Sequence, residues 1–177
     1  TQPASGLVGW WGGEGNAHDT QGTHNGTLKN GATFATGEVG QAFSLDGVDD
    51  YVDIPDSPDL DLTNQLTVET WINPASYGKI NNDFGELGAG AILAKNFGGD
   101  QTYKFDVYYL ANALYSELNR GGNFYDALLT SQLKYRLSTL IPSNTWSHVA
   151  TTWDGSTLII YVNGQEISRM ATGGSIR

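Results

Sequence analysis

Apolar residues recur at every second position in several short stretches of this chain, a pattern typical of half-buried β-strands. In the clearest stretch, residues 66–72, apolar and polar side chains alternate until Pro74 ends the strand. Residues 158–162 and 165–168 flank Asn163-Gly164, a dipeptide that favours the type I′ turn of a β-hairpin. Further predicted strands are 31–34, 42–46, 51–54, 91–95, 103–110 and 146–153. The chain is therefore predicted to be all-β, with antiparallel strands.

Two side chains in these strands have more than one possible role. Trp71 falls in the stretch 66–72, and we expect it to pack in the core or on the inner face of the sheet rather than stack on a ligand. His148 falls in the stretch 146–153 and could serve catalysis. A histidine held in a strand by packing and one hydrogen bond is the commoner case, and it is the one that we expect here.

The stretch from Gly40 to Pro55 is the most acidic part of the chain. Two short strand patterns are joined by a turn at Asp46-Gly47, and four aspartates lie within eight residues, namely Asp46, Asp49, Asp50 and Asp53. Two interpretations remain open, a solvated acidic hairpin and a site for a cation or a polar ligand. On the second interpretation Asp49, Asp50 and Tyr51 are candidate ligand-binding residues.

The loop 14–26 has no periodicity and is rich in Gly, Asn, Asp and Thr. Such a loop can bring several oxygen atoms toward one point, as hard cations require, or it can be closed by its own side chains. His18 and His24 could suggest zinc, but no third ligand at a suitable spacing supports it.

A polar and aromatic strand face is predicted in the stretch 103–110, where Lys104, Asp106 and Tyr108 share one side. Such a face suits a sugar, whose hydroxyl groups need hydrogen bonds and whose C–H groups pack on rings. Aromatic pairs between neighbouring strands give the same pattern without a ligand. Tyr108 is therefore a candidate ligand-binding residue.

Composition limits the classes of partner. The 177 residues fit one domain, and the net charge of −10 disfavours nucleic acid and anionic membrane surfaces while leaving calcium and neutral sugars open. The chain has no Cys, which excludes disulfides, a thiol nucleophile and Cys-ligated zinc. No apolar run approaches the roughly 20 residues that span a bilayer, so membrane insertion is not expected.

Several blocks of the sequence resemble one known family. Gly37-Glu-Val-Gly-Gln-Ala-Phe-Ser-Leu-Asp-Gly-Val-Asp-Asp-Tyr-Val is similar to the signature of laminin-G-like, concanavalin A-like domains of secreted bacterial proteins. Blocks similar to other parts of that family follow the same order along the chain: 6–11, 15–28, 66–74, 146–156 and 158–164. The resemblance implies a single jelly-roll β-sandwich over residues 1–177, outside the cell or on its surface.

The resemblance also implies a structural calcium, for which Asp19 and Gly22 are the matching positions. Members of the family usually continue with a last strand, often of the Ile-Asp-Glu-Val-Arg-Ile-Tyr type, that has no counterpart here. We expect either an open sheet edge or completion of the sheet by another segment or chain.

The function implied by the resemblance is a non-catalytic carbohydrate-binding module whose partner is a poly- or oligosaccharide. The alternatives are a glycoside hydrolase or polysaccharide lyase on the same fold, and a protein-binding adhesion or spacer domain. The Glu-x-Asp-x-x-Glu pattern of sandwich glucanases is absent, and Asp59 and Asp61 lie in a predicted loop. A lyase could use His148, Tyr161 and Arg136, but no motif joins them. An enzyme is therefore not the leading expectation.

Overall fold

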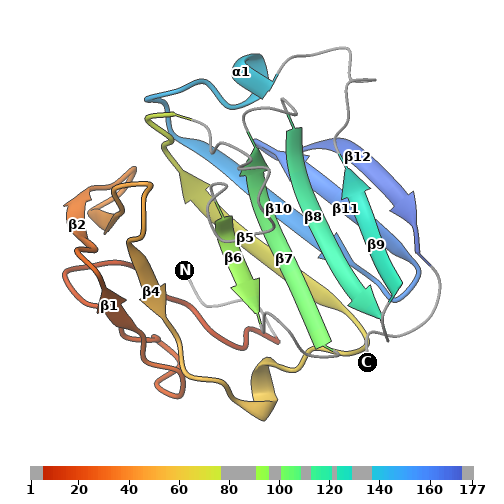
Figure 1. Ribbon diagram of the computed structural model, residues 1–177, viewed down its shortest axis with the longest axis horizontal. Coiled ribbons are helices and arrows are strands. Elements are labelled where there is room, and N and C mark those ends of the chain that lie inside the picture. The colour runs from red at the N-terminus through yellow and green to blue at the C-terminus, as the bar shows by residue number, and fades with distance from the viewer. Residues whose placement is uncertain are drawn as a thin grey trace. The chain divides into compact units, whose positions relative to one another are not determined.

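The computed structural model describes residues 6–76, 91–95, 101–108, 113–120, 123–128 and 137–172 (Figure 1). These residues form twelve strands, and every strand pair is antiparallel. The prediction of an all-β antiparallel fold is confirmed. The chain divides into two compact units, Thr1–Asp61 and Leu62–Arg177, and the expectation of a single domain stays a prediction.

The 1–61 unit contains two small strand pairs. Strand β1 (Thr27–Lys29) pairs with β4 (Tyr51–Asp53), and β2 (Thr33–Thr36) pairs with β3 (Gln41–Ser44). A single 3-10 turn, η1 (Pro58–Leu60), follows them.

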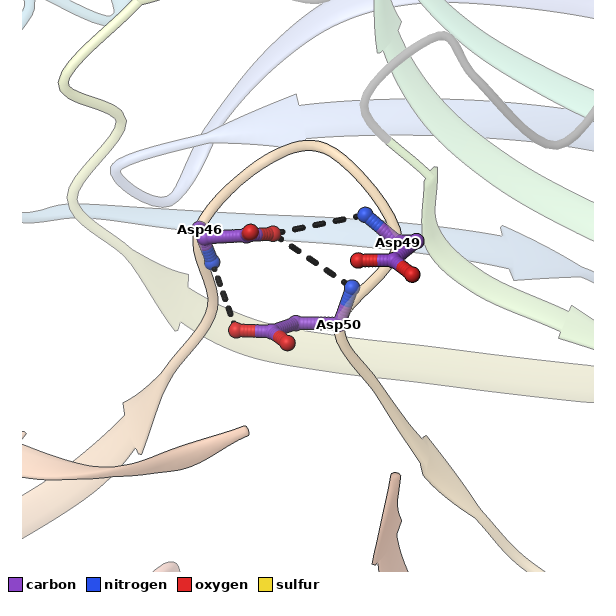
Figure 2. A group of neighbouring side chains, drawn as sticks. All are labelled: Asp46, Asp49 and Asp50. Carbon is purple, nitrogen blue, oxygen red and sulfur yellow. Dashed lines mark hydrogen bonds between the residues drawn. The ribbon is translucent and has the colours of Figure 1, made fainter. Parts of the chain in front are cut away.

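The predicted hairpin within the acidic stretch is therefore wrong, because β3 and β4 form but do not pair with each other. The turn between them is held by side chains (Figure 2). The Asp46 carboxylate accepts hydrogen bonds from the backbone N–H groups of Val48, Asp49 and Asp50. Those N–H groups are consequently not available to a β-ladder.

The 62–177 unit is a sandwich of two four-stranded sheets, which Figure 1 shows stacked face to face. One sheet has the order β12-β11-β10-β5 and the other the order β6-β7-β8-β9. The strands of the first sheet are β5 (Leu66–Ile72), β10 (Ser147–Trp153), β11 (Thr157–Val162) and β12 (Gln165–Ala171). Those of the second are β6 (Ala91–Lys95), β7 (Gln101–Tyr108), β8 (Ala113–Arg120) and β9 (Asn123–Leu128), and one short helix, α1 (Leu137–Leu140), precedes β10.

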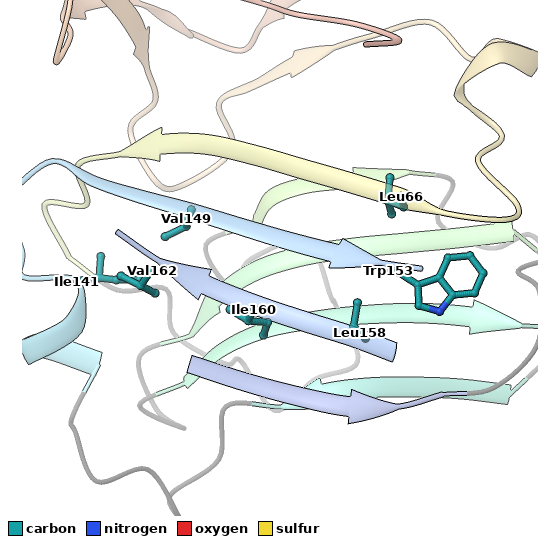
Figure 3. Packing of buried hydrophobic residues seen from close by; sticks show 7 residues of the cluster. All are labelled: Leu66, Ile141, Val149, Trp153, Leu158, Ile160 and Val162. Atoms are coloured by element: carbon teal, nitrogen blue, oxygen red, sulfur yellow. The ribbon is translucent and has the colours of Figure 1, made fainter. Parts of the chain in front are cut away.

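The core lies between these two sheets (Figure 3). Ile92 of β6 packs against it from the second sheet. Trp153 is the largest buried side chain, and its indole N–H donates to the Thr172 hydroxyl at 2.9 Å. Burial of one large apolar side chain contributes about 1.5–3 kcal/mol, so the cluster supplies much of the stability of this unit. Its members are Leu66, Ile141, Val149, Trp153, Leu158, Ile160 and Val162.

The predicted hairpin around Asn163-Gly164 is confirmed. Both residues have positive φ, 50° and 75°, and they join β11 to β12. The Asn163 side chain also accepts a hydrogen bond from the backbone N–H of His148 at 2.9 Å. The turn is thereby tied to the neighbouring strand β10.

The expectation that Trp71 packs inside is wrong, since this residue is 50% exposed. Leu66, Val68 and Ile72 of the same strand face the core. Because side chains alternate along a strand, Trp71 must then point outward together with Glu69.

None of the helices in the described part of the chain has the length and apolar character needed to cross a membrane.

A buried polar contact links the two sheets and can be tested. The hydroxyl groups of Ser116 on β8 and Thr151 on β10 lie 2.8 Å apart, and both residues are buried. Either Ser116→Ala or Thr151→Val leaves one buried hydroxyl without its partner, so each should lower the free energy of unfolding by about 1–3 kcal/mol.

The double variant should cost less than the sum of the single variants, because neither hydroxyl remains. Urea unfolding of the four proteins measures this coupling. Strictly additive losses would contradict the contact.

Candidate functional site

The acidic turn brings three carboxylates together. One oxygen from each of Asp46, Asp49 and Asp50 lies within 4.8 Å of the others (Figure 2). Asp46 and Asp49 are exposed and Asp50 is half-buried. Carboxylate oxygens at this spacing are a ligand set that hard cations accept.

Hydrogen bonds within the turn also account for much of this cluster. The Val48 N–H is the main cause that lowers the pKa of Asp46, since it donates to the Asp46 carboxylate at 2.8 Å. The Asp50 carboxylate accepts from the backbone N–H of Asp46 at 3.0 Å, and the Asn30 amide donates to the Asp49 carbonyl at 2.6 Å. Two of the three carboxylates thus have a role in closing the turn, whether or not an ion binds.

Tyr51 and Tyr108, the two tyrosines predicted to contact a ligand, lie in different units. Tyr51 opens β4 directly after the acidic turn, opposite Lys29, and is 49% exposed. Asp49, Asp50 and Tyr51 are therefore adjacent, as their sequence positions require. Tyr108 ends β7 in the 62–177 unit, where it pairs with Ala113, and its side chain lies outside the described residues.

Asp19, predicted to bind calcium, is almost completely buried and accepts hydrogen bonds on both carboxylate oxygens. Its Oδ1 accepts from the backbone N–H groups of Trp10 at 2.8 Å and Gln21 at 3.0 Å. Its Oδ2 accepts from the backbone N–H groups of Thr23 and His24 and from the Thr23 hydroxyl, at 3.2 to 3.4 Å. We call these five residues the Asp19 network.

The buried His24 ring extends the network. Its Nδ1 lies 3.3 Å from the Asp19 carboxylate and 2.8 Å from the Thr23 hydroxyl. Its Nε2 lies 3.6 Å from the carboxylate of Asp59 in η1. The two histidines considered for zinc are far from equivalent, because His18 is exposed.

This geometry does not fit a calcium ligand at Asp19. A cation needs oxygen lone pairs directed at it, whereas five N–H or O–H donors already point at this carboxylate. Gly22 donates its N–H to the Asp19 carbonyl at 2.8 Å, which closes a turn. The calcium itself stays a prediction.

The outward side of the β12-β11-β10-β5 sheet carries a second group of polar and aromatic side chains. Trp71 on β5 lies opposite His148 on β10, and their rings meet edge to face with centroids 5.4 Å apart. The Glu69 carboxylate lies 3.8 Å from the His148 Nε2. Glu69 and Tyr161 each lie opposite Ala150 on its two neighbouring strands. We call these five residues the outer face.

Trp71 and Glu69 are the accessible part of the outer face, and His148 is held in place. Trp71 is 50% exposed as a whole residue, and the side chain of Glu69 is 67% exposed. His148 is fixed in its strand by two hydrogen bonds with Asn163, one through the Asn163 side chain and one through its backbone N–H. From the sequence, His148 was expected to be structural and was not grouped with Trp71. The sequence alone does not show that these two strands are neighbours, so it gave no signal for the pairing of Trp71 with His148.

Comparison with known proteins gives a consistent picture of the fold. The sequence model described as the concanavalin A-like lectin/glucanases superfamily matches residues 46–177. Domain 4 of AbnA, an extracellular GH43 arabinanase from Geobacillus stearothermophilus solved with arabinotriose, superposes with a TM-score of 0.65 at 17% identity. The match covers 93% of this chain and 74% of that one.

Domains LG4-5 of the mouse laminin alpha1 chain superpose less well, with a TM-score of 0.45 at 13% identity over 65% of this chain and 25% of that one. Likeness at such low identity shows the fold alone, and the laminin superposition is too weak to carry an argument. No curated protein matches the chain.

The Asp19 network predicts a particular acid sensitivity. Burial alone would raise the pKa of Asp19, but N–H groups led by that of Trp10 outweigh it and lower the pKa from 3.8 to about 2. The carboxylate therefore stabilises the fold by about 2 kcal/mol above roughly pH 4, and this is lost as the pH falls toward about 2.

We expect Asp19→Asn to lack this contribution at neutral pH. The difference in unfolding free energy between wild type and variant should shrink as the pH is lowered, as measured by urea unfolding at several pH values. Asp49→Asn, in the exposed acidic turn, is the matched control. If the difference in unfolding free energy between wild type and Asp19→Asn did not change with pH, the lowered pKa of Asp19 would be contradicted.

Proposed function

The chain belongs to the concanavalin A-like lectin/glucanases superfamily, and from this premise we propose that it is a non-catalytic carbohydrate-binding module. Its ligand is a poly- or oligosaccharide, bound on the outer face of the 62–177 unit. The observation that carries the proposal is the half-exposed Trp71 beside His148 and Glu69.

The chemistry of the outer face suits a sugar. A single exposed apolar side chain is ordinary on a protein surface, but Trp71 is combined with groups that form hydrogen bonds. An indole offers an apolar surface to the C–H side of a sugar ring, while the Glu69 carboxylate and the His148 imidazole can bond its hydroxyl groups. The neighbouring Tyr161 adds a further aromatic ring with a hydroxyl.

Fixed side chains also reduce the cost of binding. Trp71 rests against the His148 ring, and His148 is held by Asn163 and lies near Glu69. Side chains that are already ordered lose less conformational entropy when a ligand binds. The arrangement thus supports recognition by a rigid strand surface rather than by a loop.

Carboxylate spacing on this sheet argues for binding rather than hydrolysis. Glu69, Ala150, Tyr161 and Glu166 lie in one row across the four strands. Strands lie 4.7–4.9 Å apart, so the backbones of the two glutamates are about 14 Å apart, whereas glycosidases hold their two carboxyl groups roughly 5–9.5 Å apart. Glu166 is moreover paired with Arg169 at 2.6 Å.

Hydrolase or lyase activity remains the alternative, as does a role in adhesion to another protein. Arg136, which a lyase could use, lies outside the described residues, whereas His148 and Tyr161 are both on the outer face. Incubation with neutral and acidic polysaccharides, followed by assay of reducing ends and of unsaturated products, should show no turnover. Turnover abolished by replacing one carboxylate, or by His148→Ala, would replace the proposal with an enzyme.

The proposed setting is extracellular or on the cell surface. The structurally similar AbnA domain comes from an extracellular enzyme and was solved with arabinotriose, which supports an oligosaccharide ligand and a secreted host for this chain. The predicted calcium stays in this proposal only as a stabilising ion at a place other than Asp19. None of the outer-face residues is a calcium candidate.

Replacing Trp71 should test the binding surface directly. We expect Trp71→Ala to weaken binding of the sugar that the wild type prefers by at least about tenfold, because the stacking surface is worth about 1.4 kcal/mol or more. Trp71→Phe should keep a part of the affinity. Isothermal titration calorimetry with a panel of neutral oligosaccharides that includes arabinotriose measures both.

Tyr51→Ala is the matched control, since Tyr51 is exposed to the same extent but lies in the 1–61 unit beside the acidic turn. It should bind as the wild type does. Loss of binding in Tyr51→Ala with full binding in Trp71→Ala would place the ligand on the acidic turn and overturn the assignment to the outer face.

A further inference from the structure

The loop 10–26 contains few regular backbone contacts. Its one isolated β-bridge joins Trp11 and Asp19. Long-range backbone hydrogen bonds within it include those from Thr20 to the Trp10 carbonyl at 2.9 Å and from Gly26 to the Ala17 carbonyl at 2.7 Å. A loop of this kind needs further interactions to hold its ends together. Either a bound cation or a network of side-chain hydrogen bonds can provide them.

We propose that the carboxylate of Asp19 closes this loop by hydrogen bonds, in the position where the family resemblance implies a calcium, and that the loop folds without a metal. Asp19 reaches back to Trp10 and forward to Gln21, Thr23 and His24. One negatively charged group thereby joins the two ends of the loop.

The donors around Asp19 differ from a cation site in kind. A cation site surrounds the ion with oxygen ligands, whereas this carboxylate is surrounded by four backbone N–H groups, one hydroxyl and the His24 ring. The side-chain oxygen of Asn25, another possible ligand, already accepts the Asp19 N–H at 3.0 Å. To bind calcium, the loop would have to turn these donors away.

The burial of the network explains why a carboxylate is needed. Asp19 and His24 are both buried, at 3% and 5% exposure. Backbone N–H groups that are withdrawn from water must find acceptors, and the two oxygens of one carboxylate can accept several bonds at once. An asparagine has only one acceptor oxygen, so it could accept either the hydrogen bonds made to Oδ1 or those made to Oδ2, but not both sets.

Metal dependence separates a hydrogen-bond network from a calcium site. Thermal unfolding of wild type and Asp19→Asn is compared in excess EDTA and in millimolar calcium. We expect Asp19→Asn to lower the Tm by about 4–8 °C, and by the same amount in both solutions. A ligand that binds only the folded state raises the Tm, so a calcium-dependent rise of the wild type that Asp19→Asn abolishes would overturn the proposal.

The control variant is Asp49→Asn, which alters the exposed acidic turn and leaves the Asp19 network intact. If calcium raises the Tm of the wild type, and the rise survives in Asp19→Asn but not in Asp49→Asn, the ion binds the acidic turn and the proposal holds.

A milder variant covers the case in which Asp19→Asn does not fold. Thr23→Val removes the hydroxyl donor and leaves the carboxylate free to bind an ion. We expect its Tm to fall by about 1–3 °C in EDTA and to fall equally in calcium. Recovery of the wild-type Tm on addition of calcium would show that an ion holds the loop, and would contradict the proposal.

Discussion

Burial of one side of β5, β10 and β11 is the constraint on which the 62–177 unit depends. The core takes Leu66 from β5, Val149 and Trp153 from β10, and three residues from β11. Because side chains alternate along each strand, the intervening residues must point outward. The outer face is a consequence of this alternation, which aligns Trp71 with His148 and places Glu69 and Tyr161 on either side of Ala150. Burial of the core thus determines which residues point outward. It does not determine that these outward residues are polar and aromatic.

The 1–61 unit is organised by a different interaction, in which acidic side chains accept hydrogen bonds from the backbone. Asp19 and Asp46 close two loops in this way, and Glu14 accepts from the Gln41 N–H at 3.1 Å. The same kind of interaction occurs in the other unit, where the Asp154 carboxylate accepts hydrogen bonds from the backbone N–H groups of Ser156 and Thr157. Some of the acidic residues behind the net charge of −10 therefore have a structural role in closing loops. An acidic composition alone does not indicate a ligand.

Six of the eight strands of the sandwich could be predicted because hydrophobic periodicity and turn residues agreed, whereas β8 and β9 were not predicted. The stretch 66–72 and the hairpin at Asn163-Gly164 were both found. Strand pairing could not be predicted for β3 and β4, since alternation does not identify a partner and the side chains of the turn use its N–H groups. For Trp71, the polar residues Thr67 and Glu69 on its own side of the strand were a better guide to its exposure than its size. Sequence placed Asp19 in an oxygen-rich loop, but only the path of the backbone shows that N–H groups surround it.

The central claim is that the outer face of the sandwich binds a neutral sugar. Its most direct test is an NMR titration of the isotopically labelled chain with neutral oligosaccharides, arabinotriose among them. The account predicts that the perturbed signals cluster on β5, β10 and β11 and include the indole N–H of Trp71. Perturbations confined to the acidic turn and β4, or none with any sugar of the panel, would contradict it.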